Sequence, residues 1–229
     1  MLADHPIPLA ALTGFISGLL ICIPVGPVNL TIIHEGARRG FRWALLIGLG
    51  ATMMEAVYCA IAFTGFASFF QKGLVKAAME LTSFVFLLFL GIKFVLAKNV
   101  AAPTHLSAAA DKLEERIEGR LHPHSAFMIG SVRVIANPAV LLFWIILAAI
   151  FISREWVEPT GASRFACVGG VAVGAGLWFT CLSYVVSLRH KQISEKTLLR
   201  LEHFSGIALL GLAFLHGANV IWQLARHRI

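Results

Sequence analysis

Residues 9–33 read LAALTGFISGLLICIPVGPVNLTII, an apolar stretch that is interrupted by Pro24, Gly26 and Pro27. The stretch exceeds the roughly 20 residues that a helix needs to cross a bilayer. Proline inside a helix removes a backbone donor and clashes with the preceding turn, so two prolines flanking a glycine should open this helix. Opened backbone at membrane depth is tolerated only against protein or a wet cavity. The stretch therefore predicts a first transmembrane helix that is broken beside a cavity.

The composition of the whole chain is that of an integral membrane protein. Hydrophobic residues make up 58% of its 229 residues, whereas charged residues make up only 14%. That charged share is about half of what a soluble domain carries. Because spanning helices can be apolar all round, a bilayer accepts this composition. The net charge of +7 suits basic cytoplasmic loops, and no aromatic-interleaved basic face predicts a nucleic-acid partner.

Six apolar stretches are predicted to cross the membrane. They are residues 9–33, 43–66, 81–97, 127–152, 165–188 and 204–224. The first, third and fifth connections carry most of the Lys and Arg residues, including Arg38, Arg39 and Arg42 in the first. By the positive-inside rule these connections face the cytoplasm of a bacterial plasma membrane, and both termini lie outside. For residues 111–121, in the third connection, we expect either a short amphipathic helix or a solvated linker.

The two halves of the chain show a weak internal repeat. Gly48 and Ala51 recur as Gly169 and Ala172, and the proline break of the first span recurs as Asn137-Pro138 in the fourth. A repeat of three helices must insert its second copy upside down, and such repeats place a transport site at their interface. We therefore predict an all-α integral membrane protein of six helices with broken helices 1 and 4. Its parts are a first repeat in 1–97, a cytoplasmic loop in 98–126 and a second inverted repeat in 127–229.

Glu55 is the strongest candidate for a functional side chain. It lies near the middle of the second span, where a charged residue costs about 3 kcal/mol on insertion scales. Intramembrane carboxyls usually mark an ion or solute path. Gly48, Thr52, Glu55 and Cys59 share one small, polar helix face, which we expect to point inward. A buried carboxyl held only for packing is the alternative.

Four further residues complete the predicted solute or ion site. Asn29 and Asn137 follow the breaks and can bind freed backbone groups or a solute. Arg133 lies one turn before Asn137, where it either pairs with Glu55, holds a substrate carboxylate, or reaches the cytoplasmic interface. His216 lies near the middle of the sixth span, as a proton relay or as a hydrogen-bonded interior residue.

The cysteines and small residues predict packing rather than chemistry. Cys22, Cys59, Cys167 and Cys181 lie in apolar stretches without a CxxC pair, so we interpret them as buried small hydrophobes. No spacing predicts a metal site or a cofactor, and no nucleophile, base and orienting partner predict an enzyme. Small-residue stripes are close-packing surfaces, and they raise the question of a homodimer. They begin at Gly14 and Gly18 in the first span, and at Gly169, Val173 and Gly176 in the fifth.

The order and spacing of several motifs resemble the LysE/RhtB family of amino-acid exporters over nearly the whole chain. The motifs are Pro24-Val25-Gly26-Pro27-Val28-Asn29, then Gly40, Gly50 and Glu55, then Phe127, Gly130, Asn137 and Pro138. The resemblance implies six helices, export of amino acids or related small polar solutes, and coupling to protons. The chain departs from the family pattern at Val25, Met54, Ala139 and Arg133, and these departures leave the solute open.

Two other functions remain as alternatives to a proton-coupled exporter. A membrane thiol transducer of the DsbD/CcdA type needs cysteines at matching repeat positions, but the position that corresponds to Cys22 is Arg133. A heavy-metal exporter needs soft ligands along one path, whereas these cysteines lie on different predicted helices. We therefore favour the exporter, with a small polar solute, protons and the lipid bilayer as its partners.

Overall fold

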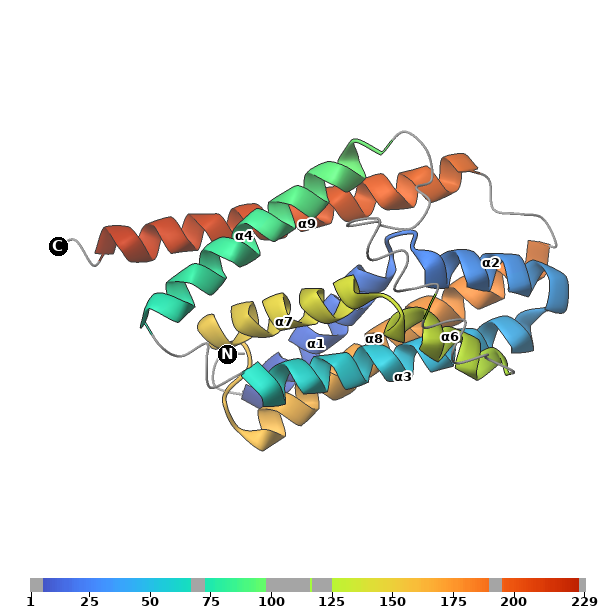
Figure 1. Cartoon of the computed structure of the whole chain (residues 1–229), viewed down its shortest axis with the longest axis horizontal. Helices are drawn as coiled ribbons and strands as arrows, with labels where there is room; N and C mark the ends of the chain where they lie inside the picture. Colours follow the sequence, from blue (N-terminus) through green and yellow to red (C-terminus); the bar gives the residue numbers. More distant parts are fainter. Residues whose placement is uncertain (1–5, 67–72, 98–115, 117–124, 190–194, 227–229) are drawn as a thin grey trace.

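The computed structural model describes residues 6–66, 73–97, 116, 125–189 and 195–226 (Figure 1). All regular secondary structure in these residues is helical, which confirms the predicted all-α class. The helices are α1 (Pro6–Cys22), α2 (Pro27–Arg39), α3 (Phe41–Phe66), α4 (Gly73–Val95), α6 (Ala126–Ile135), α7 (Pro138–Ser153), α8 (Gly161–Arg189) and α9 (Glu195–Arg226). The segment 111–121, for which a helix or a linker was predicted, lies almost wholly outside the described residues.

The first and fourth predicted spans are each divided into two helices. Helices α1 and α2 are bent by 69° at their junction, and α6 and α7 by 67°. Pro27 and Pro138 are the first residues of α2 and α7, a position where the missing backbone donor has no cost. The breaks that the prolines predict are therefore present, and each proline begins a second half-helix.

The described helices contain five candidate membrane spans. Helices α3, α8 and α9 are each long and apolar enough to cross a bilayer. The bent pairs α1–α2 and α6–α7 are also long and apolar enough when each pair is taken as one span. Phe84–Val95 of α4 is an apolar helical segment. Large apolar side chains such as Phe165, Phe214 and Leu215 are at least 67% exposed. Surface of this kind on many helices suits contact with lipid, so the chain is a multi-pass membrane protein.

One detail of the predicted spans is wrong. The first connection is not a loop, because Gly40 alone joins α2 to α3; Arg38 and Arg39 form the last turn of α2, and Arg42 lies in α3. Gly40 has φ +84°, which lets the chain turn within one residue. Helix α9 contains the whole of the predicted span 204–224 and extends beyond it, from Glu195 to Arg226.

Close contacts between glycines and backbone join α1 to α8. A Cβ atom at Gly14 or Gly18 would collide with the backbone of α8, and one at Gly170 or Gly174 would collide with that of α1. The predicted stripe from Gly169 is therefore wrong by one position, since Gly169 has open space beside it. The α1 motif packs within the chain, so it gives no support for a homodimer.

The helices form two apolar clusters that meet near the breaks. One cluster contains Trp144 and joins α1, α3, α4, α7, α8 and α9. The other joins α2, α3, α6 and α8, with Cys22 at the end of α1 and Leu198 of α9. Helices α4 and α9 lie side by side along one edge of the molecule (Figure 1). The start of α1 and the end of α9 lie toward one end of the bundle, and the α2–α3 junction lies at the opposite end (Figure 1).

Candidate solute-binding site

A cavity of about 180 Å³ lies where the two helix breaks approach each other. Four of the five predicted solute-site residues line it: Asn29, Glu55, Arg133 and Asn137. Pro24, Gly26 and Pro27 of the first break line it as well. The side chains of His216 and Pro138 lie outside the described part of the chain. The structure thus brings together residues of α2, α3 and α6 and the cap residue of α7, of which Asn29 and Asn137 are 108 positions apart.

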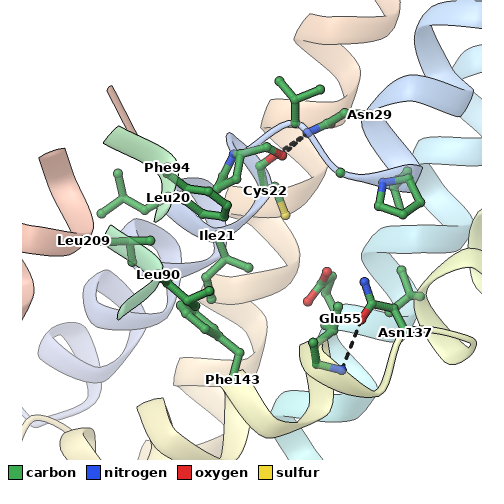
Figure 2. Close-up of a pocket in the computed structure, with 18 of the residues that line it drawn as sticks. Leu20, Ile21, Cys22, Asn29, Glu55, Leu90, Phe94, Asn137, Phe143 and Leu209 are labelled. Atoms are coloured by element: carbon green, nitrogen blue, oxygen red, sulfur yellow. Dashed lines mark hydrogen bonds between the residues drawn. The ribbon is translucent and has the colours of Figure 1, made fainter. Parts of the chain in front are cut away.

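Asn29 holds the first break together. Its Nδ2 donates hydrogen bonds to the backbone oxygens of Cys22 at 2.8 Å and Pro24 at 2.6 Å (Figure 2). These carbonyls lack helical partners because the chain leaves the helix before Pro27. Its Oδ1 accepts a hydrogen bond from Nε1 of Trp178 on α8 at 3.1 Å. Both amide hydrogens of Asn29 are therefore used by the break, and the side chain is 4% exposed.

The second break is held by a cap and by a neighbouring helix. Oδ1 of Asn137 accepts a hydrogen bond from the backbone N of Ala139 at 3.1 Å, which caps α7 (Figure 2). The freed carbonyl of Ile135 accepts one from the hydroxyl of Tyr58 on α3 at 3.2 Å. Arg133 lies on α6 just before this break and lines the cavity. Its guanidinium can hold a carboxylate with two parallel hydrogen bonds.

Glu55 lies on α3 and faces the cavity at 5% exposure (Figure 2). It is 14 residues from the start of a 26-residue helix, or about 21 Å along about 39 Å. Its Oε2 accepts a hydrogen bond from Nε1 of Trp144 on α7 at 2.6 Å. Thr52 and Cys59 of the same face are also buried, so that face points inward as predicted. The cavity therefore presents a carboxyl group near the middle of a membrane span.

Three residues of the site were missed by the sequence analysis. Lys93 of α4 lines the cavity, and Trp144 and Trp178 hold Glu55 and Asn29. Lys93 had a usable signal, since it lies inside the predicted span 81–97 and an intramembrane lysine marks a functional site. The tryptophans had none, because a donor that reaches another helix is not visible in a local pattern. The charged lining of the cavity is thus Glu55, Lys93 and Arg133.

The cysteines differ from the prediction in two ways. Cys181 is exposed rather than buried, because it lies on an outward face of α8. Cys59 of α3 and Cys167 of α8 neighbour each other in one buried cluster, a contact that no motif indicated. Both thiols are buried and neither lines the cavity, so a partner thiol cannot reach them through it. Within the described residues, no group of three or more His, Cys, Asp or Glu side chains could hold a metal.

Comparison with known proteins finds relatives and a family that match most of the chain. A protein of Bacillus subtilis (strain 168) named "Putative amino acid efflux protein YcgF" is 27% identical over 213 residues, which cover 93% of this chain and 97% of that protein. The "Chemotactic transduction protein ChpE" of Pseudomonas aeruginosa (strain PAO1) is 25% identical over 202 residues, 88% of this chain and 94% of that protein. No solved structure matches the chain. Residues 19–218 match the family described as LysE type translocator, and the chain therefore belongs to that family.

Proposed function

We propose that this translocator exports amino acids across a bacterial plasma membrane in exchange for protons. The observation that carries the proposal is the buried Glu55 in a cavity between two broken helices, which Arg133 also lines. Discontinuous membrane helices supply sites of this kind in secondary transporters. The similarity to a protein named for amino acid efflux supports the choice of solute.

The site offers complementary charges for a zwitterion. Arg133 would bind the α-carboxylate, and Glu55 would bind the α-ammonium group. Asn29 and Asn137 would keep the two breaks open, because their side chains bond to the backbone at the breaks. A proton and an ammonium group would compete for the same Glu55 carboxylate. Exchange of one for the other on opposite sides of the membrane would couple outward solute movement to inward proton movement.

Alternating access would come from two inverted repeats, residues 1–97 and 127–229, joined by the loop 98–126. Three features support this arrangement. Each repeat begins with a bent pair, α1–α2 in one and α6–α7 in the other. The first half of each pair packs closely on the middle helix of the other repeat: α1 on α8 through Gly14 and Gly170, and α6 on α3 through Gly130 and Gly50. The third helices of the two repeats, α4 and α9, pack on each other. Helix α4 would then also cross the membrane and bring the number of spans to six.

The distribution of charge supports an orientation with both termini outside. Arg38, Arg39 and Arg42 gather at the α2–α3 junction, opposite the end where α1 begins and α9 ends (Figure 1). Basic residues of short connections remain in the cytoplasm. The cavity would then receive solute from the end that carries these arginines and release it at the other.

Transport by reconstituted vesicles tests the proposal. Vesicles loaded with a labelled amino-acid panel should release label faster under a pH gradient that is acid outside, and Glu55→Gln should lose this acceleration. Glu158→Gln is the matched control, because Glu158 is an exposed carboxylate between α7 and α8. If the wild type moves no amino acid under any gradient, the solute assignment is wrong. If Glu55→Gln still responds to the gradient, Glu55 is not the proton-linked group.

A further inference from the structure

Four of the helices around the cavity are locked together by glycine contacts. A Cβ atom at Gly50 or Gly130 would collide with backbone across the α3–α6 contact, and one at Gly14 would collide with the backbone of α8. A Cβ atom at Gly48 of α3 would collide with Phe179 of α8. Helices whose backbones touch in this way cannot slide past each other. Helices α1, α3, α6 and α8 therefore form one body, which we call the core.

Helices α4 and α9 form a second body. A Cβ atom at Gly91 of α4 would collide with Leu210, and one at Gly206 of α9 would collide with the backbone of α4. No described glycine joins this pair to another helix. The pair meets the other helices through side chains, as where the rings of Phe86 and Phe143 lie 6.0 Å apart. Because side-chain interfaces permit small sliding movements, the α4–α9 pair can move as a unit against the core (Figure 1).

The two bodies divide the charges of the cavity between them. The core contributes Glu55 from α3 and Arg133 from α6, whereas the α4–α9 pair contributes Lys93 from α4. Leu90 and Phe94, the cavity-lining neighbours of Lys93 on α4, lie across the view from Glu55 (Figure 2). Among the described residues, no ion pair joins Lys93 to Glu55. The lysine and the carboxylate therefore lie on separate walls of the cavity.

Lys93 differs from Arg133 in how its distance from Glu55 responds to movement. Helices α3 and α6 belong to the same body, so the distance between Glu55 and Arg133 stays nearly constant. The distance between Glu55 and Lys93 changes whenever the α4–α9 pair moves. Opposite charges attract more strongly at low solvent exposure than in water. An ionised Glu55 without a bound partner therefore draws Lys93, and the α4–α9 pair with it, toward the core.

The other polar groups near Glu55 cannot replace Lys93 in this role. Trp144 already donates its indole hydrogen to Oε2 of Glu55, and it carries no charge. Thiols and phenols with ordinary pKa values are uncharged at neutral pH. The groups of this kind that lie near Glu55 are those of Cys22, Tyr58 and Cys59.

We propose that Lys93 keeps the exchange of solute and protons coupled. It binds ionised Glu55 across the cavity when neither a proton nor a solute occupies this carboxylate, and it thereby holds the α4–α9 pair against the core. A proton on Glu55 cancels the negative charge, and a solute ammonium group takes the place of Lys93. Either event releases the α4–α9 pair, whereas the empty, ionised transporter stays locked. This role of Lys93 rests on the proposed function.

Proton uptake measured together with solute release tests the role of Lys93. Vesicles that contain a trapped pH dye are loaded with the labelled amino acid that the wild type releases fastest. Lys93→Gln should take up about 10- to 100-fold fewer protons per released solute, the factor that corresponds to one hydrogen bond between charged groups. Lys93→Arg keeps the positive charge and should restore coupling. Arg200→Gln is the control, because it removes an exposed charge of α9 outside the cavity.

The ratio of protons to solute does not depend on how much protein inserts. A wild-type ratio in Lys93→Gln would overturn the role of Lys93 and leave proton-coupled export standing. Loss of all transport in a folded Lys93→Gln would overturn it too, since Lys93 would then be needed to bind the solute. Release of amino acid by the wild type without proton uptake would overturn the proposed coupling itself.

Distances between spin labels test the lock without changing Lys93. Cys181 is exposed on α8 and takes one label. The second label goes on α9 in Ile207→Cys or, as a control within the core, on α3 in Leu46→Cys, since both side chains are exposed. At alkaline pH the α8–α9 distances should spread more widely when Glu55→Gln is added, whereas the α8–α3 distances should not change. An α8–α9 distribution that Glu55→Gln leaves unchanged would contradict the lock.

Discussion

The two helix breaks reach nearly the same bend by different means. At the first, Pro24 and Gly26 lie in a four-residue gap that ends before Pro27, the first residue of α2. The freed carbonyls are bound by Asn29 from the helix that follows. At the second, Asn137 caps its own helix, and the freed carbonyl of Ile135 is bound by Tyr58 from α3. The first break is thus held mainly from within its own span, whereas the second depends on another part of the chain.

This difference has a consequence for coupling. Helix α3 carries Glu55 as well as Tyr58, and Glu55 binds Trp144 on α7 just beyond the second break. The Glu55 carboxyl group therefore lies on the same helix as Tyr58, which holds the second break. Among the described residues, no hydrogen bond joins Glu55 to the first break. A charged acceptor makes a stronger hydrogen bond than a neutral one. Protonation of Glu55 should then loosen α7 more than α2.

Removal of the Asn29 amide should have the largest effect on stability. Asn29→Ala leaves the Cys22 and Pro24 carbonyls and the Trp178 indole without their partner, the first in a buried place and the other two in partly buried places. Unsatisfied buried groups cost about 1–3 kcal/mol each, so we expect a loss of roughly 3 kcal/mol or more after partial relaxation. Thermal unfolding in detergent measures it. A Tm equal to that of the wild type would show that the first break does not depend on Asn29.

Trp144→Phe should have the next largest effect. The change keeps an aromatic ring in the core but removes the donor to Glu55, which is 5% exposed. A hydrogen bond to a charged group is worth about 1.5–3 kcal/mol. The loss in Tm should be smaller in Trp144→Phe/Glu55→Gln than the sum of the two single variants, since Trp144→Phe removes the bond that Glu55→Gln weakens by making the acceptor neutral. Strict additivity of the two losses would contradict a direct bond.

Asn137→Ala should cost less than Asn29→Ala, although both remove an asparagine at a break. The lost interaction is one cap to the backbone N of Ala139, worth about 1 kcal/mol. Asn137→Asp preserves the capping oxygen and should recover most of the stability. Comparison of the two alanine variants in one unfolding assay sharpens the contrast between the breaks. Equal losses would mean that the second break carries constraints beyond its cap.

Local chemistry accounts for what the sequence could predict. Pro24, Pro27 and Pro138 act on their own helices, so the positions of the breaks followed from single residues. Glu55 was found from its depth in an apolar stretch. The partners that fix these groups were not predictable: Trp144 is 89 positions from Glu55, and Trp178 is 149 positions from Asn29. Lys93 reaches the cavity only because α4 packs on α7 and α9.

Tyr58→Phe should give the smallest effect, and it isolates the bond between α3 and the second break. The hydroxyl donates at 3.2 Å from a half-buried ring to the Ile135 carbonyl, so its loss should cost about 0.5–1.5 kcal/mol. Because the same carbonyl belongs to the span that carries Arg133, transport should slow more than stability alone predicts. Vesicle efflux per folded protein measures this effect, with Tyr184→Phe on the outward face of α8 as the control. If both tyrosine variants transport at the wild-type rate, the coupling of the second break to α3 is not functional, and the two breaks differ only in how they are built.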